Sequence, residues 1–297
     1  MAYPDIPAPV KNMLAIPAMR WRHRYWHWVK NERFVTHPAN TELVQALADI
    51  GWSAALTGEP GSGLDFLFMH RMMIENVDAQ LAVAGDPDWP RVIGWDDIPA
   101  APDDPDWPEP HVEDLDDPAA WPTDQRLLDY EGIAEARSAA VVSQNLERAQ
   151  ILRSEEFLTR DTTTLDRYGF LLEVTVHNWM HMRYSATPPL DGDALDAEND
   201  YLGAPFSSHV NPYFWKLHGW IDDCIGLWEE ANDAEADFST AWRAPEDAPP
   251  EDELLPPGAP LVAAIAPSPE QWTERGLAPF AAPASLVAQA LGDIHAQ

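Results

Sequence analysis

The amino-acid sequence predicts a mainly α protein whose helices are separated by long loops rich in proline and aspartate. Apolar residues recur at helical spacing over residues 41–51 and 124–158, as they do along the buried face of an amphipathic helix. His177 and His181 are four positions apart, which places both side chains on one face of a helix. By contrast, residues 85–124 contain nine prolines and thirteen acidic residues, a composition that excludes regular helix.

Each predicted element has a local signal. Residues 18–36 are expected to form a basic, aromatic-rich helix that ends near His37, because the proline after His37 disfavours a helical residue before it. Thr41 begins the next helix, since a threonine side chain can accept a hydrogen bond from the first turn. Four tryptophans in the loop 85–124 are expected to pin it to the protein surface. The long helix that follows has an apolar face without candidate ligands, so we expect it to be scaffold.

The composition indicates a folded and strongly acidic protein. Of its 297 residues, 45% are hydrophobic and 14 are tryptophan, which is enough apolar surface for a sizeable core. The formal net charge is −32 and no basic stripe offsets it, so the chain would repel nucleic acid and anionic membrane surfaces. We therefore expect no nucleic-acid partner and no membrane partner.

Three features favour a cytoplasmic protein. No apolar run approaches the roughly 20 residues that span a bilayer. The first residues lack the charged and then apolar pattern of a signal peptide. Cys224 is the only cysteine, so an internal disulfide is excluded, in agreement with a reducing compartment.

Three histidines form the leading candidate metal site. His177 and His181 lie in the helix predicted within residues 162–183, and His218 lies in a later predicted helix. A set of imidazoles without thiolate or carboxylate suits copper, zinc, iron or nickel. The ligand types alone therefore predict a transition-metal site without selecting the metal.

The residues around these histidines resemble the second copper-binding half of the tyrosinase, catechol oxidase and hemocyanin family. That half has a helical His-x-x-x-His, followed by Asp-Pro-x-Phe, an aromatic residue, two residues, His, three residues and Asp. The matching positions of this chain are Asn211, Pro212, Phe214, Trp215, His218 and Asp222. The chain departs from the pattern at Asn211, where the family has Asp.

A first copper-binding half is also recognisable. Residues 66–71, FLFMHR, resemble the family's Phe-Leu-x-Trp-His-Arg, a match that makes His70 a ligand. Residues 34–37, FVTH, resemble the run that ends in the family's first ligand, which makes His37 another. The family's remaining ligand falls at Gly61, so the resemblance leaves one expected imidazole missing.

The resemblance implies a tyrosinase-like helical bundle that holds a dicopper centre, with two copper ions expected and one as the alternative. It implies an enzyme that uses O2 to ortho-hydroxylate or oxidise a phenolic or o-aminophenolic small molecule, or a tyrosine in a peptide. Glu173 would hold a water beside the metal and Asn178 would polarise it, so that together they remove the phenol proton. Some bacterial members of the family are exported with a helper protein, so a copper-loading partner and assisted export stay open.

His23 and His27 form a second pair at helical spacing. Either one of them replaces the ligand that is missing at Gly61, or both pack among the neighbouring tryptophans. The alternative for the whole chain is a degenerate homologue that binds a single copper through His177, His181 and His218 (the three histidines of the second half). Such a protein would act as a mononuclear oxygenase or as a non-catalytic copper-binding or interaction protein.

Two other classes of metalloenzyme are excluded by local pattern. A zinc hydrolase places a glutamate inside its helical histidine pair, whereas Trp179 and Met180 occupy those positions here. A carboxylate-bridged di-iron bundle requires paired Glu-x-x-His motifs, which the chain lacks. The acidic residues of 85–124 and 190–200 favour a neutral or cationic substrate over an anionic one.

The chain divides into three predicted parts. The resemblance covers residues 18–232, and we predict a copper domain over 1–240 with the acidic loop as an insert. Proline and acidic residues predict a linker at 241–267. Residues 268–297 are predicted to form an amphipathic tail, which either packs on the copper domain or covers the active site.

Overall fold

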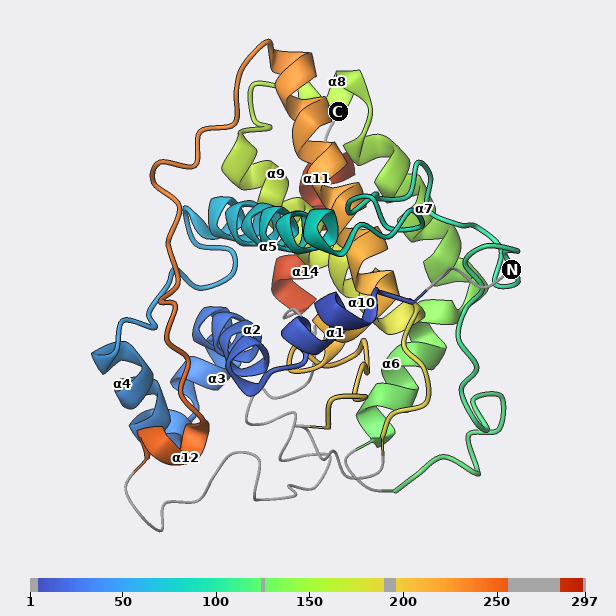
Figure 1. The fold of residues 1–297 in the computed structure, drawn as a ribbon. Coiled ribbons are helices and arrows are strands. Elements are labelled where there is room, and N and C mark those ends of the chain that lie inside the picture. Colours follow the sequence, from blue (N-terminus) through green and yellow to red (C-terminus); the bar gives the residue numbers. More distant parts are fainter. Residues whose placement is uncertain (1–4, 124–125, 190–195, 256–283, 296–297) are drawn as a thin grey trace.

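The computed structural model describes residues 5–123, 126–189, 196–255 and 284–295, and all regular structure in these ranges is helical (Figure 1). In chain order the elements are α1 (Ala8–Leu14), α2 (Pro17–Lys30), α3 (Glu32–Thr36), the 3-10 turn η1 (Pro38–Asn40), α4 (Thr41–Asp49), α5 (Ser62–Ala84), α6 (Leu127–Arg137), α7 (Ala139–Leu152), α8 (Glu155–Leu158), α9 (Leu165–Leu172), the π-helical turn η2 (Glu173–His177), α10 (Asn178–Arg183), the 3-10 turn η3 (Ser208–Val210), α11 (Pro212–Asn232), α12 (Glu251–Leu254) and α14 (Ala284–His295). The prediction of a mainly α protein is thus confirmed. Within the described ranges, no helix combines the length and apolarity that crossing a membrane requires.

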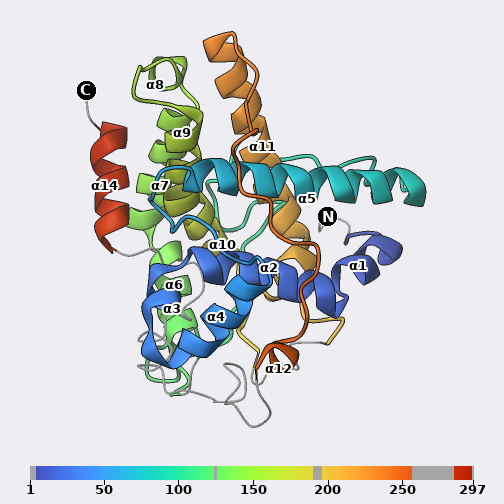
Figure 2. The ribbon, with the colours of Figure 1, turned by 90° about the vertical axis from the view of Figure 1, so that its left-hand side faces the viewer.

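Two long helices, α5 and α11, cross near the middle of the molecule (Figures 1 and 2). Each carries one of the predicted ligands, His70 on α5 and His218 on α11. His177 and His181 lie on a third stretch, the continuous run of α9, η2 and α10. Within this run, α9 packs against α5. The candidate site therefore lies where three separate stretches of the chain meet.

Two pairs of glycines allow backbone segments of this arrangement to approach each other closely. Gly63 of α5 and Gly169 of α9 face each other, and a Cβ on either one would collide with backbone atoms of the other helix. Gly94 in the acidic loop and Gly219 on α11 are matched in the same way. Because Gly219 directly follows His218, the loop backbone lies against the turn of α11 that carries this histidine.

Side-chain caps divide two helices that the apolar pattern predicts to be continuous. The predicted helix 18–36 is two helices, because the side-chain oxygen of Asn31 accepts a hydrogen bond from the first turn of α3 at 3.2 Å. The predicted helix 124–158 is three helices, because Ser138 and Ser154 cap α7 and α8 in the same way. These residue types favour helix starts over helix interiors, since their side chains bond to nearby backbone.

The acidic loop 85–124 is held by its tryptophans, as the sequence predicts. Trp89, Trp95 and Trp107 are at most 7% exposed and belong to the main core. Trp121 is half-buried and packs in a smaller second cluster. This part of the chain therefore has a defined position over α10 and α11 without any regular helix.

The described C-terminal residues also pack on the helical body. The indole nitrogen of Trp52 donates to the carbonyl oxygen of Asp247 at 2.9 Å, which fixes the start of the predicted linker. Helix α14 packs against η2 and α7 (Figure 2) and buries Ala290 and Ile294. The rest of the predicted linker and the first part of the predicted tail, 256–283, lie outside the described residues.

Candidate metal centre

Four histidine rings meet where α5, η2, α10 and α11 converge. These residues are His70, His177, His181 and His218, and none is more than 1% exposed. The ring centroids of His70 and His218 are 4.2 Å apart, and those of His177 and His181 are 4.5 Å apart. One ligand nitrogen from each of His70, His177 and His218 lies within 4.8 Å of the other two. This buried triad could hold a metal ion.

Backbone carbonyls fix the orientation of these rings. Nδ1 of His70 lies 2.8 Å from the carbonyl oxygen of Phe66, and Nδ1 of His218 lies 2.6 Å from that of Phe214. His181 is held similarly by a loop carbonyl, at 2.9 Å. A carbonyl only accepts, so Nδ1 carries the proton and Nε2 presents its lone pair. Nε2 of His70 and Nε2 of His218 are buried and make no hydrogen bond within the described residues, as expected of metal-ligating imidazoles.

Burial keeps these imidazoles neutral. It lowers the pKa of His177 to about 4 and lowers the pKa of His70, His181 and His218 well below the ordinary value. The neighbouring imidazoles lower these three pKa values further, since each additional positive charge would repel the others. Neutral imidazole is the form that binds a metal, so the cluster presents ligands at neutral pH.

A π-helical turn places the ring of His177. The turn η2 interrupts the α-helical run from α9 to α10, and single π turns of this kind occur often at functional sites. The side-chain oxygen of Asn178 lies 3.0 Å from Nδ1 of His177. The structure thus brings Asn178 to the site as a direct contact of the His177 ring. Its predicted action on a water stays a prediction.

Helix α2 brings a second group of histidines beside this cluster. The rings of His27 and His177 are nearly parallel, with centroids 6.4 Å apart, and Nε2 of His27 lies 3.2 Å from Nε2 of His23. Nδ1 of His23 lies 3.1 Å from Nδ1 of His209, whose Nε2 lies 3.0 Å from the carbonyl oxygen of Leu14. The carbonyl requires His209 to donate through Nε2. In the neutral ring Nδ1 then accepts from His23, in keeping with a satisfied turn residue.

The sequence carries a further signal for this arrangement. A pair His-x-x-x-His followed by a histidine in a later helix occurs twice, as His23, His27 and His70 and as His177, His181 and His218. The resemblance to the first copper-binding half leaves two alternatives for the α2 pair: one histidine replaces the ligand missing at Gly61, or both pack among the neighbouring tryptophans. The structure places both members of that pair beside the four clustered histidines, with His23 buried and His27 half-buried.

Two positions of the first predicted half lie apart from the converging nitrogens. Nδ1 of His37 accepts a hydrogen bond from the backbone N–H of Ala39 at 3.1 Å and so caps η1, and His37 is not part of the described triad. Gly61 precedes α5 with a φ of 93°, and its N–H donates to Asp166 at 2.9 Å. The geometry therefore gives His37 no support as a ligand, and Gly61 serves as a helix start.

Glu173 begins the π-helical turn and is 6% exposed. Burial raises the pKa of its carboxyl to about 6; Asp65 raises this pKa further, while Lys30 and a hydrogen bond from Thr57 lower it. Oε2 of Glu173 is buried and has no hydrogen-bond partner within the described residues. A carboxylate with this pKa, one turn before His177, can accept and return a proton near neutral pH.

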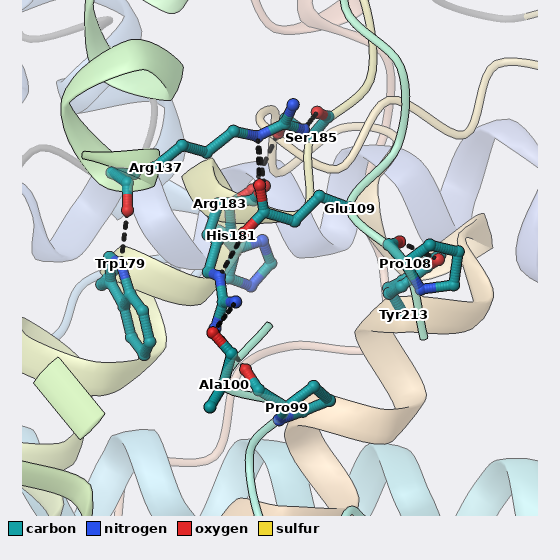
Figure 3. Close-up of polar contacts among 11 residues, drawn as sticks. Pro99, Ala100, Pro108, Glu109, Arg137, Trp179, His181, Arg183, Ser185 and Tyr213 are labelled. Carbon is teal, nitrogen blue, oxygen red and sulfur yellow. Dashed lines mark hydrogen bonds and ion pairs between the residues drawn. The ribbon is translucent and has the colours of Figure 1, made fainter. Parts of the chain in front are cut away.

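Arg183, two residues beyond His181, anchors α10 to the acidic loop (Figure 3). Its Nε donates to Oε1 of Glu109 at 2.7 Å, and a terminal nitrogen donates to the carbonyl oxygen of Pro99 at 2.7 Å. Arg137 of α6 donates to the carbonyl oxygen of Arg183 at 2.9 Å and lies 3.5 Å from the same carboxylate. This buried network fixes the end of α10 and, through it, the ring of His181.

No protein-family model matches this chain, and no curated protein sequence matches it. The chemistry of the site therefore has to be inferred from its own residues. Their geometry brings together buried imidazoles that could hold a metal ion, with a protonatable carboxyl group one helical turn before His177.

Proposed function

We propose that the protein is a copper-dependent oxidoreductase that uses dioxygen to ortho-hydroxylate or oxidise a phenolic substrate. The observation that carries this proposal is the triad His70, His177 and His218, whose ligand nitrogens converge within 4.8 Å in a fully buried site. Neutral imidazoles held by backbone carbonyls suit a transition metal. The motif resemblance around residues 66–71 and 211–222 favours copper among the metals that accept such ligands.

The histidine group divides into two sets of three. One set combines the α2 pair with the histidine of α5, and the other combines the pair of η2 and α10 with the histidine of α11: His23, His27 and His70; His177, His181 and His218. Copper ions bound by these sets would supply the site at which dioxygen is reduced. This assignment replaces His37 with a residue of α2 and needs no ligand at Gly61.

The protein residues near the site would orient groups and transfer protons. Glu173 is mostly ionised at pH 7, because its pKa is about 6, and so can accept the proton of a phenol hydroxyl. Asn178 holds the ring of His177. We therefore expect Glu173→Gln to slow hydroxylation of monophenols more than oxidation of catechols, since a catechol loses its protons more readily.

One specific observation favours a second candidate, a centre with a single copper. The converging triad takes His70 from the first predicted half and His177 and His218 from the second. Three imidazoles from both halves would satisfy one ion and leave the α2 pair as hydrogen-bonding residues. Such a protein would be a mononuclear oxygenase or a copper-binding protein without phenol oxidation.

Copper content distinguishes these candidates. The protein would be loaded anaerobically with Cu(I), washed, analysed for copper per chain, and then given oxygen together with a catechol. Two copper ions and catechol oxidation support the proposal, whereas one ion without oxidation supports the second candidate, and retention of no copper refutes both. His27→Ala should remove one of two ions and leave a single-copper centre unchanged. His37→Ala serves as the matched control, because His37 lies outside the triad, and it should retain all copper.

A further inference from the structure

A pocket of about 320 Å³ lies beside the histidine group, between α1, α2, α5, α11 and the segment after α11. His23 forms part of its wall, and so does Trp26, whose ring centroid is 5.8 Å from that of His70. Met69, another wall residue, directly precedes His70 on α5. The pocket wall therefore includes residues next to the candidate metal centre. The volume of the pocket is in the range of small-molecule sites.

The wall of this pocket is unusually rich in methionine. It includes five of the eight methionines of the chain: Met13, Met19, Met69, Met72 and Met73. The three on α5 are spaced as neighbours on one helical face. Three tryptophans stand in the same wall: Trp26, Trp215 and Trp242. Thioether side chains adapt their shape and make favourable contacts with aromatic rings, so the wall suits a flat aromatic body.

Two arginines stand in the same wall, Arg22 and Arg243. Arg243 is exposed and lies over the ring of Phe68, 4.7 Å from its centroid. Neither arginine forms an ion pair within the part of the chain that the structure describes, although the protein has 50 acidic residues against 18 basic ones. Among the described residues, the only acidic one in the wall is Glu246. The pocket is therefore locally basic in a strongly acidic protein.

We propose that this pocket binds an aromatic carboxylate. The ring lies among the methionine and tryptophan side chains, and the carboxylate lies at Arg22 and Arg243, because the guanidinium fork matches a carboxylate in charge and geometry. The binding itself requires no metal; only the identification of this ligand as the substrate rests on the proposed function. The local charge of the pocket opposes the expectation of a neutral or cationic substrate, which was based on the net charge of the chain.

The binding can be observed directly at the methionines. Metal-free protein labelled with methyl-13C methionine would be titrated with 3-(4-hydroxyphenyl)propanoate and, separately, with its methyl ester. The acid is expected to shift the methyl signals of the pocket methionines, each assigned by a Met→Leu variant. Met180 and Met182 lie outside the pocket wall, so their signals should not move and they serve as internal controls.

The role of the arginines is tested by charge removal. Arg22→Gln and Arg243→Gln should each weaken binding of the acid about tenfold, the usual effect of losing one charge-assisted hydrogen bond, and leave binding of the ester unchanged. Arg33→Gln, an exposed arginine on α3, is the matched control and should alter neither. Equal affinity for acid and ester, absence of binding, or shifts confined to Met180 and Met182 would overturn the proposal. If the protein binds the acid but retains no copper in the loading experiment, the proposed function is refuted and the pocket assignment stands.

Discussion

Arg71 and Asp222 join the two helices that carry His70 and His218. Nε of Arg71 lies 2.7 Å from Oδ1 of Asp222, and both side chains are half-buried. Arg71 directly follows His70, and Asp222 lies four residues, about one helical turn, after His218. The ion pair therefore bridges α5 and α11 beside the point at which their histidine rings stack.

Asp222→Asn is expected to lower the free energy of unfolding by about 0.5–1 kcal/mol, because water screens a partly exposed ion pair. A double-mutant cycle with Arg71→Met, measured by urea denaturation of the metal-free protein, isolates the pair from other effects of each change. Additive effects of the two substitutions would show that the pair makes no contribution.

Glu109→Gln should destabilise the protein far more. Arg183 is fully buried and Glu109 is 9% exposed, so the substitution leaves a buried guanidinium without its counter-charge. Removing one partner of such a pair costs roughly 3–5 kcal/mol. Glu113→Gln is the matched control, since Glu113 lies on the same loop and is exposed. Similar urea midpoints for the two variants would contradict the role assigned to Glu109.

Gly63→Ala tests the close contact between α5 and α9. A Cβ at this position meets backbone atoms of Asp166 and Phe170, so the two helices must separate, at a cost of about 3 kcal/mol or more. Gly226→Ala on α11 is the control, because an added Cβ there meets no described atom within 4 Å apart from its chain neighbours and the backbone of its own helix. In a helix this second change should stabilise the protein by up to about 1 kcal/mol. Thermal denaturation of both variants compares the two effects.

The carboxyl of Glu173 predicts a specific pH dependence of stability. Burial raises its pKa from 4.5 to about 6, so the folded state binds this proton more tightly than the unfolded state does. Below pH 4.5 the protonated carboxyl of Glu173 therefore adds about 2 kcal/mol to the free energy of unfolding. This contribution is lost as the pH rises through 6.

Glu173→Gln removes this titration. Between pH 4.5 and 7, the stability of the variant should therefore rise relative to the original protein by that amount. Urea denaturation of both metal-free proteins across the range would show the rise. A constant difference between the two would mean that Glu173 does not bind its proton more tightly when the protein is folded.

The helical class and the loop with its tryptophan anchors were predictable because they depend on periodicity and composition. The breaks at Asn31, Ser138 and Ser154 were not predicted. At each of these positions a short polar side chain bonds to the next turn of backbone, and the apolar pattern continues across the break. Local hydrogen bonding competes with periodicity at such sites, and the sequence alone does not show which one prevails.

The candidate site was predictable where ligands share one helix or one motif. The spacing of His177 and His181 and the motif around His218 both point to residues that the structure brings together. The ring of His37 caps η1 and so lies apart from the site. The position of His27 depends on how α2 lies relative to η2. Distances between separate helices follow from tertiary packing, which no local pattern contains.

The Nε2 atoms of His70 and His218, which make no hydrogen bond within the described residues, also bear on how long the chain persists in a cell. A buried polar atom without a hydrogen bond destabilises the fold by about 1–3 kcal/mol. An ion that ligates both atoms removes this penalty and adds binding free energy that only the folded chain can gain. Loaded molecules should therefore unfold less often and escape proteolysis for longer. The supply of the ligating metal would then control the abundance of the protein, independently of any turnover of substrate.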